Sequence, residues 1–462
     1  MSFDLLRELE ARAGQQFELH GQYLNQQLVR VLRTIGFDRD YTRAEGQYLF
    51  DRQGRRYLDL LAGFGVFALG RNHPTVKRAL ASVLDADLAN LVQMDVSLLA
   101  GLLAERLLAQ LPGQERVFFC NSGTEAVETA IKLARSATGR AQLLCCEHAF
   151  HGLTMGSLSL NGEALFREGF GPLLSDVTSI PFNDLAALER ALSGKRAAAF
   201  LVEPIQGKGV HLPRPDYLHQ AQQLCRKYGT LLVADEIQTG LGRTGRFTAV
   251  EHAGVEPDLV LLAKALSGGF VPVGAVAGKR WIFDRVFNRM DRAVVHGSTF
   301  GKNNLAMAAG LATLAVLSEE GLIENAARRG ASLLRRLEAL VPKYELLREV
   351  RGQGLMLALE FAAPRSRSLR AAWSLLESAA KGLFCQMVTI PLFSRHQILS
   401  QVAGHEMYVI KLLPPLCIDE SDEDWIVRAF DDVIADCHKV PGALWELATT
   451  LAGQALKNKM AG

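Results

Sequence analysis

Two ionisable side chains follow apolar segments that lie close together in the chain. Asp235 ends the segment 230–235, and Lys264 follows the apolar run 259–263. Because the carboxyl ends of neighbouring parallel strands meet at one edge of a sheet, a carboxylate and an amine placed there can hold opposite ends of one flat cofactor. Pyridoxal phosphate (PLP) requires that pair, an acid at its ring nitrogen and a lysine at its aldehyde carbon. The pattern therefore predicts an enzyme that binds PLP.

The apolar surroundings of both residues disfavour a merely solvated role. A lysine that enters a buried region is destabilising unless it is neutralised or bonded. Attachment to the cofactor would remove the charge of Lys264, and the amine freed by the substrate would then act as a base. A lysine that extends to the surface is the simpler alternative. Asp235 and Glu236 could instead cap a helix or bind a metal, but the apolar residues before them favour a buried partner.

Two further segments could contact the same cofactor. Asn-Ser-Gly-Thr-Glu-Ala at 121–126 follows a predicted strand and opens a helix, where free N–H groups bind phosphate. An ordinary capped turn between strand and helix is the alternative. Phe150, in Phe-His-Gly at 150–152, could stack on a flat ring. It could equally be a core phenylalanine.

Composition limits the classes of protein to consider. The chain has 462 residues, of which 49% are hydrophobic and 22% charged, with a net charge of +2. These values are typical of an ordinary soluble globular protein and give no support for a nucleic-acid or membrane partner. The seven cysteines form no Cys-x-x-Cys spacing, which favours reduced core cysteines over a metal site. With no signal-peptide pattern at the N-terminus, we expect the cytoplasm.

Near-continuous apolar runs alternate with helical segments through the middle of the chain. They predict an α/β fold with a mainly parallel sheet covered by helices on both faces, with strands at 117–120, 142–146, 198–203, 231–235, 259–262 and 273–277. A small hairpin is predicted within 48–59, and two later strands at 355–360 and 408–412. We expect a large domain at 86–330 and a small α+β domain formed by both termini, 1–85 and 331–462.

The motifs as a set resemble the class III (ornithine/4-aminobutyrate type) PLP-dependent aminotransferases. They are Asn-Ser-Gly-Thr-Glu-Ala (121–126), Phe-His-Gly (150–152), Glu-Pro-Ile-Gln-Gly (203–207), Asp-Glu-Ile-Gln-Thr-Gly-Leu-Gly-Arg-Thr-Gly (235–245), Ala-Lys-Ala-Leu (263–266) and His-Gly-Ser-Thr-Phe-Gly (296–301). The resemblance implies a fold-type I transferase that is a homodimer with its active site at the subunit interface. It also implies ping-pong transfer of an amino group between an amine and a keto acid or aldehyde.

The resemblance also implies roles for individual residues. Lys264 is the Schiff-base lysine and Asp235 the partner of the pyridine nitrogen, and these two are the predicted catalytic residues. Thr299 would reach the phosphate from the neighbouring subunit. The other predicted cofactor-binding residues lie within one chain: Ser122, Gly123, Thr124, Phe150, His151, Glu203 and Gln238. Among them, Phe150 would stack on the ring, and Gln238, supported by Glu203, would bond the ring hydroxyl.

Two positions depart from the family pattern. Family members that use glutamate carry a glutamate and an arginine that pair as a switch, and Lys208 and Lys411 occupy those positions here. Two lysines cannot form that ion pair, and a lysine is not a bidentate carboxylate clamp. Together with Phe64 and Phe67, they are the predicted substrate-binding residues. This set favours a primary amine, or an amino group on an apolar or extended chain, as the substrate.

Two other functions remain open at this stage. A PLP-dependent aminomutase, racemase, epimerase or decarboxylase of the same fold would need no second amino acceptor, which suits the lost switch. Product analysis without any keto acid distinguishes that reading from transamination. A non-catalytic binding protein is a third possibility, although Lys264, Asp235 and Gln238 occurring together argue against it.

Overall fold

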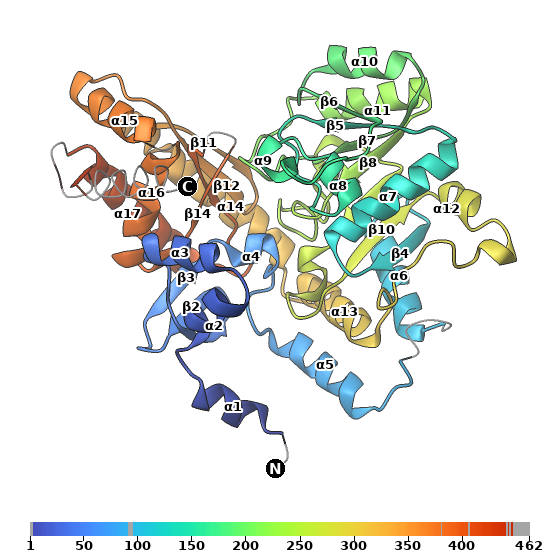
Figure 1. Ribbon diagram of the computed structural model, residues 1–462, viewed down its shortest axis with the longest axis horizontal. Helices are drawn as coiled ribbons and strands as arrows, with labels where there is room; N and C mark the ends of the chain where they lie inside the picture. Colours follow the sequence, from blue (N-terminus) through green and yellow to red (C-terminus); the bar gives the residue numbers. More distant parts are fainter. Residues whose placement is uncertain are drawn as a thin grey trace.

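The computed structural model describes residues 3–90, 96–379, 381–404, 407–439, 442 and 445–446. Two units lie side by side in Figure 1, with the central part of the chain in one and both chain ends in the other. The larger unit is organised around a seven-stranded sheet, and the smaller contains two four-stranded sheets. Residues 447–462 all lie outside the described part, so the expected C-terminal segment is described only up to residue 446.

The seven-stranded sheet positions the predicted site. Its strands are β4 (Arg116–Cys120), β5 (Gln142–Cys146), β6 (Val177–Ile180), β7 (Ala197–Val202), β8 (Leu231–Asp235), β9 (Leu259–Leu262) and β10 (Gly274–Gly278). Their order is β4-β10-β9-β8-β7-β5-β6, and β10 runs antiparallel to both of its neighbours while the other pairs are parallel. The predicted mainly parallel sheet is confirmed. The edge strand β6 was not predicted, because Val-Thr-Ser-Ile carries two polar residues and is not an apolar run.

The central strands are apolar at every position except Asp235, the last residue of β8, because helices cover both faces of this sheet. Alternate residues of β7 and β8, such as Leu201 and Val233, pack against α7 (Gly123–Thr138) and α12 (Arg280–Val286). The residues between them, such as Phe200 and Leu232, pack against α10 (Leu185–Ser193) and α11 (Tyr217–Tyr228). Full burial of each such side chain stabilises the fold by about 1.5–3 kcal/mol. The sheet is therefore a rigid platform for its strand ends.

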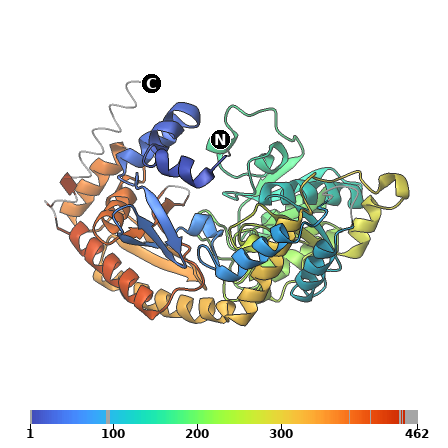
Figure 2. The same ribbon diagram turned by 90° about the horizontal axis from the view of Figure 1, so that it is seen from below.

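Toward β4 and β10, a second group of helices covers the sheet. It consists of α5 (Pro74–Asp85), α6 (Leu98–Ala109) and α13 (Asn304–Glu319), whose apolar side chains share one core with β9 and β10. The next helix, α14 (Leu322–Glu338), leads into the smaller unit, and α13 and α14 run along one side of the molecule in Figure 2. No single helix in the described residues is long and apolar enough to cross a membrane; α13 and α14 meet that test only jointly, with a 59° bend between them.

The smaller unit joins segments from both chain ends. The N-terminal strands β1 (Tyr41–Glu45), β2 (Tyr48–Asp51) and β3 (Arg56–Asp59) pair with β13 (Ile398–Leu399). The C-terminal sheet contains β11 (Leu347–Gln353), β12 (Met356–Phe361), β15 (Val409–Leu412) and β14 (Gln401–Ala403). Its remaining helices are α15 (Arg367–Ala379), α16 (Leu383–Ser394) and α17 (Glu420–Cys437), and the chain begins with α1 (Leu5–Ala11), α2 (Gln16–Tyr23) and α3 (Gln26–Thr34).

One apolar core holds the two chain ends of this unit together. Leu58 and Leu60 are fully buried in the same cluster as Phe384 and Phe430 from the C-terminal helices. We therefore propose the small domain as a unit of both termini, as its sequence suggests. Val76 of α5, by contrast, belongs to the core of the larger unit. We propose that the N-terminal segment passes into the large domain before α5, upstream of residue 85.

Candidate active site

Asp235 and Lys264 come from neighbouring parallel strands and line one cavity. Asp235 is the last residue of β8 and pairs in register with Leu261 of β9, the strand that Lys264 follows. Because the strands are parallel, both side chains leave the sheet at its carboxyl edge. The cavity there has a volume of about 700 Å³. Because β8 and β9 are neighbours, the two ionisable groups at their ends share this one cavity.

Lys264 has the surroundings of a reactive amine. Burial lowers the pKa of its ammonium, so the uncharged, nucleophilic form is more accessible than in a surface lysine. Its backbone has a φ of 43°, in the left-handed region that few non-glycine residues adopt. Such strain is concentrated at functional sites. Within the described residues the amine makes no hydrogen bond or ion pair, so it is available to a ligand in the cavity.

Asp235 is held by two donors. Its Oδ2 lies 2.7 Å from Nδ1 of His151, and its Oδ1 accepts from the backbone N–H of Ile237 at 3.1 Å. Although burial opposes a charged imidazole, the hydrogen bond and charge of Asp235 raise the pKa of His151. The Nε2 atom of His151 is buried and has no hydrogen-bond partner in the described structure. The pair keeps a carboxylate in place at the base of the cavity while its remaining lone pairs stay available.

The N-terminus of α7 forms another part of the cavity wall. Ser122 caps this helix by accepting from the N–H of Glu125, and Gly123 and Thr124 line the cavity. The first N–H groups of a helix have no acceptor within it, and with the helix dipole they favour an anion. A Cβ at Gly123 would lie 3.0 Å from the Ile237 side chain, so glycine permits this close packing. The geometry fits the predicted phosphate end.

A network of polar groups borders the cavity opposite this helix. The buried Glu203 accepts from the N–H groups of Phe150 (3.0 Å) and Gly207 (2.9 Å). Burial raises the pKa of Glu203. Lys411, from β15, donates to the carbonyl of Gly207 at 2.9 Å and to Oε1 of Gln238 at 3.3 Å. These bonds connect the small domain to the loops that follow the strands of the large one.

Lys208 faces an acidic and an aromatic partner. Its Nζ lies 3.2 Å from Oε1 of Glu163 and 5.4 Å from the ring centroid of Phe166. Phe166 lies in α9 (Ala164–Arg167) and makes an edge contact with Phe150, with ring centroids 5.5 Å apart. The ion pair therefore holds the short helix α9 against the cavity, and an aromatic wall results.

The structure brings most of the predicted residues to this one cavity. The predicted residues that line it are Phe64, Gly123, Thr124, Phe150, His151, Glu203, Lys208, Asp235, Gln238, Lys264 and Lys411. Three do not line it. Ser122 acts as the helix cap, the ring of Phe67 packs on Arg71 at 3.8 Å and against Gly269, and Thr299 is exposed.

Sequence reasoning did not predict several apolar residues of the cavity wall: Leu153, Phe166, Ile205, Val402, Ala403 and Met407. They come from loops, the short helix α9 and a short edge strand, where too few residues follow one another for periodicity to mark the face that a side chain takes.

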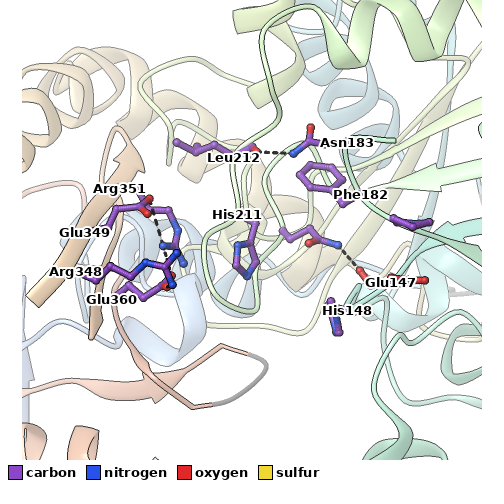
Figure 3. A pocket seen from close by; sticks show the side chains of 12 residues that line it. Glu147, His148, Phe182, Asn183, His211, Leu212, Arg348, Glu349, Arg351 and Glu360 are labelled. Atoms are coloured by element: carbon purple, nitrogen blue, oxygen red, sulfur yellow. Dashed lines mark hydrogen bonds and ion pairs between the residues drawn. The ribbon is translucent and has the colours of Figure 1, made fainter. Parts of the chain in front are cut away.

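A second cavity of about 510 Å³ lies behind the loop 206–211 (Figure 3). His211 projects into it between β11 and β12 on one side and the loop carrying Glu147 and His148 on the other. Arg351 of β11 ties this loop to the small domain through bonds to the carbonyls of Gly209 (2.7 Å) and Val210 (2.9 Å) and an ion pair with Glu360. The same loop carries Lys208 on the active-site side.

We expect Arg351→Met to lower the free energy of unfolding by about 2–3 kcal/mol, because it removes one member of a hydrogen-bonded ion pair whose side chains are only 10% and 19% exposed. Arg348→Met is the matched control: Arg348 also contacts Glu360, at 3.2 Å, but its side chain is 65% exposed. The control should lose at most about 1 kcal/mol. Urea titration of both variants measures the difference. Equal losses would contradict a special role for Arg351.

A seven-stranded sheet with one antiparallel strand, together with a lysine, a buried aspartate and a helix N-terminus at its carboxyl edge, defines a PLP-dependent enzyme of fold type I. Residues 33–434 match the family model of the class III aminotransferases. The chain belongs to this family, is a transaminase and uses pyridoxal phosphate.

Named relatives agree with this assignment. The chain is 39% identical over 410 residues to an ornithine aminotransferase of Bordetella pertussis, covering 87% of this chain and 92% of that protein. It is 36% identical over 445 residues to the aminotransferase PigE of a Serratia strain, covering 89% of this chain but only 52% of PigE, about half of its length. A PLP-bound amine transaminase from an uncultivated Pseudomonas species superposes with a TM-score of 0.75 at 32% identity, covering 86% of this chain and 95% of that one.

The residues present fit the cofactor that the family uses. Lys264 offers an unengaged amine, Asp235 a buried carboxylate, and α7 unbonded N–H groups at a wall that glycine keeps open. When bound, PLP supplies an electron-withdrawing ring that stabilises negative charge on the substrate carbon. The side chains supply the rest of the chemistry by binding, orienting and moving protons.

Proposed function

We propose that Lys264 and Asp235 are the catalytic residues of this transaminase. Lys264 would bind the cofactor covalently and, once released by the substrate, carry a proton between two carbons as a general base. Its depressed pKa supports this role, because a base must be uncharged near neutral pH. Asp235 would keep the ring nitrogen protonated, and its hydrogen bond with His151 supports that role by fixing the carboxylate.

We propose further roles for the surrounding residues, in line with the family pattern. Phe150 would stack on the ring, and Gln238 would bond the ring hydroxyl, with Glu203 organising the loops on either side. The N–H groups of Gly123 and Thr124, in a helix capped by Ser122, would bind the phosphate. All except Ser122 line the cavity, which supports the assignment.

We propose that the amino donor is a primary amine on an apolar or extended chain, and that the acceptor is a keto acid or an aldehyde. The observation that carries this proposal is the apolar wall formed by Leu153, Phe166, Ile205, Val402 and Met407. Lys208, the nearest surface-side cation, is engaged by Glu163 and is not set up as a carboxylate clamp. Phe64 lies at the same cavity, whereas Phe67 packs away from it, so we retain only Phe64 as a substrate contact.

A donor panel tests this proposal. Linear primary amines of increasing length should each discharge the cofactor's absorbance in a single half-reaction, with kcat/KM rising as the chain reaches the apolar wall. Each methylene buried there should add roughly 0.8 kcal/mol, about fourfold per step. If no amine discharges the absorbance while glutamate or ornithine does, the amine assignment is wrong.

Ornithine is a second candidate donor, because named relatives are ornithine aminotransferases and its side-chain amino group is itself a primary amine. A donor that carries a carboxylate needs a cation at the substrate end of the cavity. The panel therefore includes ornithine and, beside it, the primary amine of equal chain length that lacks the carboxylate. A large preference for ornithine would show that such a cation is present.

We also propose that the enzyme acts in the cytoplasm as a homodimer in which Thr299 serves the neighbouring subunit's site. All seven cysteines are free, which supports a reducing compartment. Thr299 is exposed in the single chain, and Met290, Val294 and Phe300 nearby expose 95%, 78% and 58% of their surfaces. Apolar exposure of this extent suits an interface.

Mixing two variants, at a PLP concentration too low to fill the Thr299→Ala site, tests the shared site. A Lys264→Ala chain paired with a Thr299→Ala chain restores one complete site if Thr299 acts across the interface. Because equal mixing gives half mixed dimers, each with one intact site, about a quarter of wild-type activity should return after co-refolding. If Thr299 acts within its own chain, no mixed dimer has a complete site and no recovery is expected.

A further inference from the structure

The family pattern predicts an arginine at the position of Lys411 in glutamate-using members, and the surroundings of Lys411 differ from those of a ligand-binding cation. The residue is only 5% exposed. Its Nζ donates to two acceptors of the protein itself, the carbonyl of Gly207 at 2.9 Å and Oε1 of Gln238 at 3.3 Å. Burial, followed by the neighbouring Lys264, lowers the pKa of Lys411 to about 7. In its neutral form a lysine has two N–H donors, and both have partners here.

The bonds of Lys411 settle how the amide of Gln238 is oriented. An ammonium or amine that donates must face the amide oxygen, and a carbonyl that accepts must face the amide nitrogen. Lys411 donates to the amide oxygen of Gln238. The amide nitrogen of Gln238, Nε2, donates to the carbonyl of Phe64 at 3.0 Å. The two contacts require the same orientation of the amide, so neither could persist if it were flipped.

The packing at Gly207 shows that this arrangement is tight. A Cβ at Gly207 would lie 2.5 Å from Oε1 of Gln238 and 3.1 Å from Oε1 of Glu203. The amide therefore has no space to move toward the loop. At its other end, Phe64 has a φ of 61°, in the left-handed region. The bond from Gln238 holds a turn that its own backbone does not favour.

We propose that Lys411 is a positioning residue: it orients the amide of Gln238 and, through it, the Phe64 turn, and it does not bind a substrate carboxylate. The contact links three segments that are remote in the chain, β15, the loop after β8 and the turn after β3. The part of the inference that concerns catalysis rests on the proposed contact between Gln238 and the cofactor.

A double-mutant cycle on cofactor binding tests the coupling. Lys411→Met retains the chain volume and removes the donor, and Gln238→Leu removes the amide. Each single change should weaken binding of PLP to the apo-enzyme about tenfold, and the double variant should bind no more weakly than Gln238→Leu alone. Lys77→Met, at an exposed lysine of α5, is the control and should not alter the affinity. Losses that add independently would overturn the proposal.

Kinetics with a matched pair of donors test the second half of the proposal. Lys411→Met should lower kcat/KM about 10–100-fold for a linear amine and by the same factor for the amino acid that carries the same chain. Lys411→Arg keeps a donor and should restore PLP affinity to within about threefold of wild type. A loss confined to the carboxylated donor, seen as a raised KM, would instead make Lys411 a substrate ligand.

The two measurements keep this proposal separate from the proposed function. If the wild-type enzyme turns over no amine, the substrate assignment fails. The PLP-binding cycle still tests whether Lys411 positions Gln238. If Lys411→Met does not fold, Lys411→Leu, which also removes the donor, takes its place in the cycle, and additive losses overturn the proposal in the same way.

Discussion

Replacing Lys264 with alanine is expected to lower transamination at least about 10⁴-fold. The change removes both the covalent attachment to the cofactor and the base that moves the substrate proton, and general base catalysis alone contributes up to about 10⁴. The variant should still bind PLP, because Asp235, α7 and Gln238 are unchanged. Single-turnover absorbance with a saturating amine measures the loss.

Two controls make the Lys264 result specific. Lys77→Ala, at an exposed position in α5, should retain wild-type activity. Borohydride followed by denaturation should leave the cofactor attached to the wild-type chain and to Lys77→Ala, but not to Lys264→Ala. Added methylamine should restore part of the lost rate, because a small amine can enter the space left by the side chain. A Lys264→Ala chain that still retained the cofactor after borohydride would assign the attachment to another lysine.

Asp235→Asn is expected to lower kcat/KM about 10³-fold. An ion pair between unit charges about 4 Å apart contributes roughly 4 kcal/mol at an effective dielectric near 20, and each 1.36 kcal/mol corresponds to a tenfold change in rate. Asparagine has nearly the same shape and can still accept the N–H of Ile237, so the loss would report on the charge. Half-reaction rates with one amine donor provide the measurement.

His151→Gln separates the charge of Asp235 from its orientation. This variant loses the imidazole that holds Oδ2 at 2.7 Å but keeps the carboxylate. Loss of a supporting partner of this kind typically lowers activity about 10–100-fold, less than loss of the charge itself. If His151→Gln were as inactive as Asp235→Asn, the histidine rather than the aspartate would be the decisive group, and the assigned role of Asp235 would be wrong.

Much of the large domain could be predicted because its signals are local. The runs 142–146, 231–235 and 259–262 are apolar except for Gln142 and Asp235 at their ends, since each strand is covered on both faces, and their predicted bounds agree with β5, β8 and β9. The hairpin predicted within 48–59 is formed by β2 and β3. The edge strand β6 was not predicted, because an edge strand with polar residues resembles a loop in sequence.

The candidate site residues could also be predicted because their sequence signals are local. A carboxylate and a lysine after two apolar strands must leave a parallel sheet at one edge, so Asp235 and Lys264 could be brought together without coordinates. A helix that opens with glycine after a strand likewise indicated a candidate anion site, with an ordinary capped turn as the alternative. These inferences depend only on neighbours within a few residues in the chain.

Only the tertiary structure decided which side chains share contacts across long distances in the sequence. His151 and Asp235 are separated by 84 positions, and Lys411 and Gln238 by 173. The sequence does not distinguish Phe64 from Phe67, yet Phe64 lines the cavity and Phe67 packs on Arg71. Such choices are made by the packing of whole elements, which sets the direction of every side chain at once. The residues that we propose to do the chemistry could therefore be identified from local sequence, and the partners that orient them only from the fold.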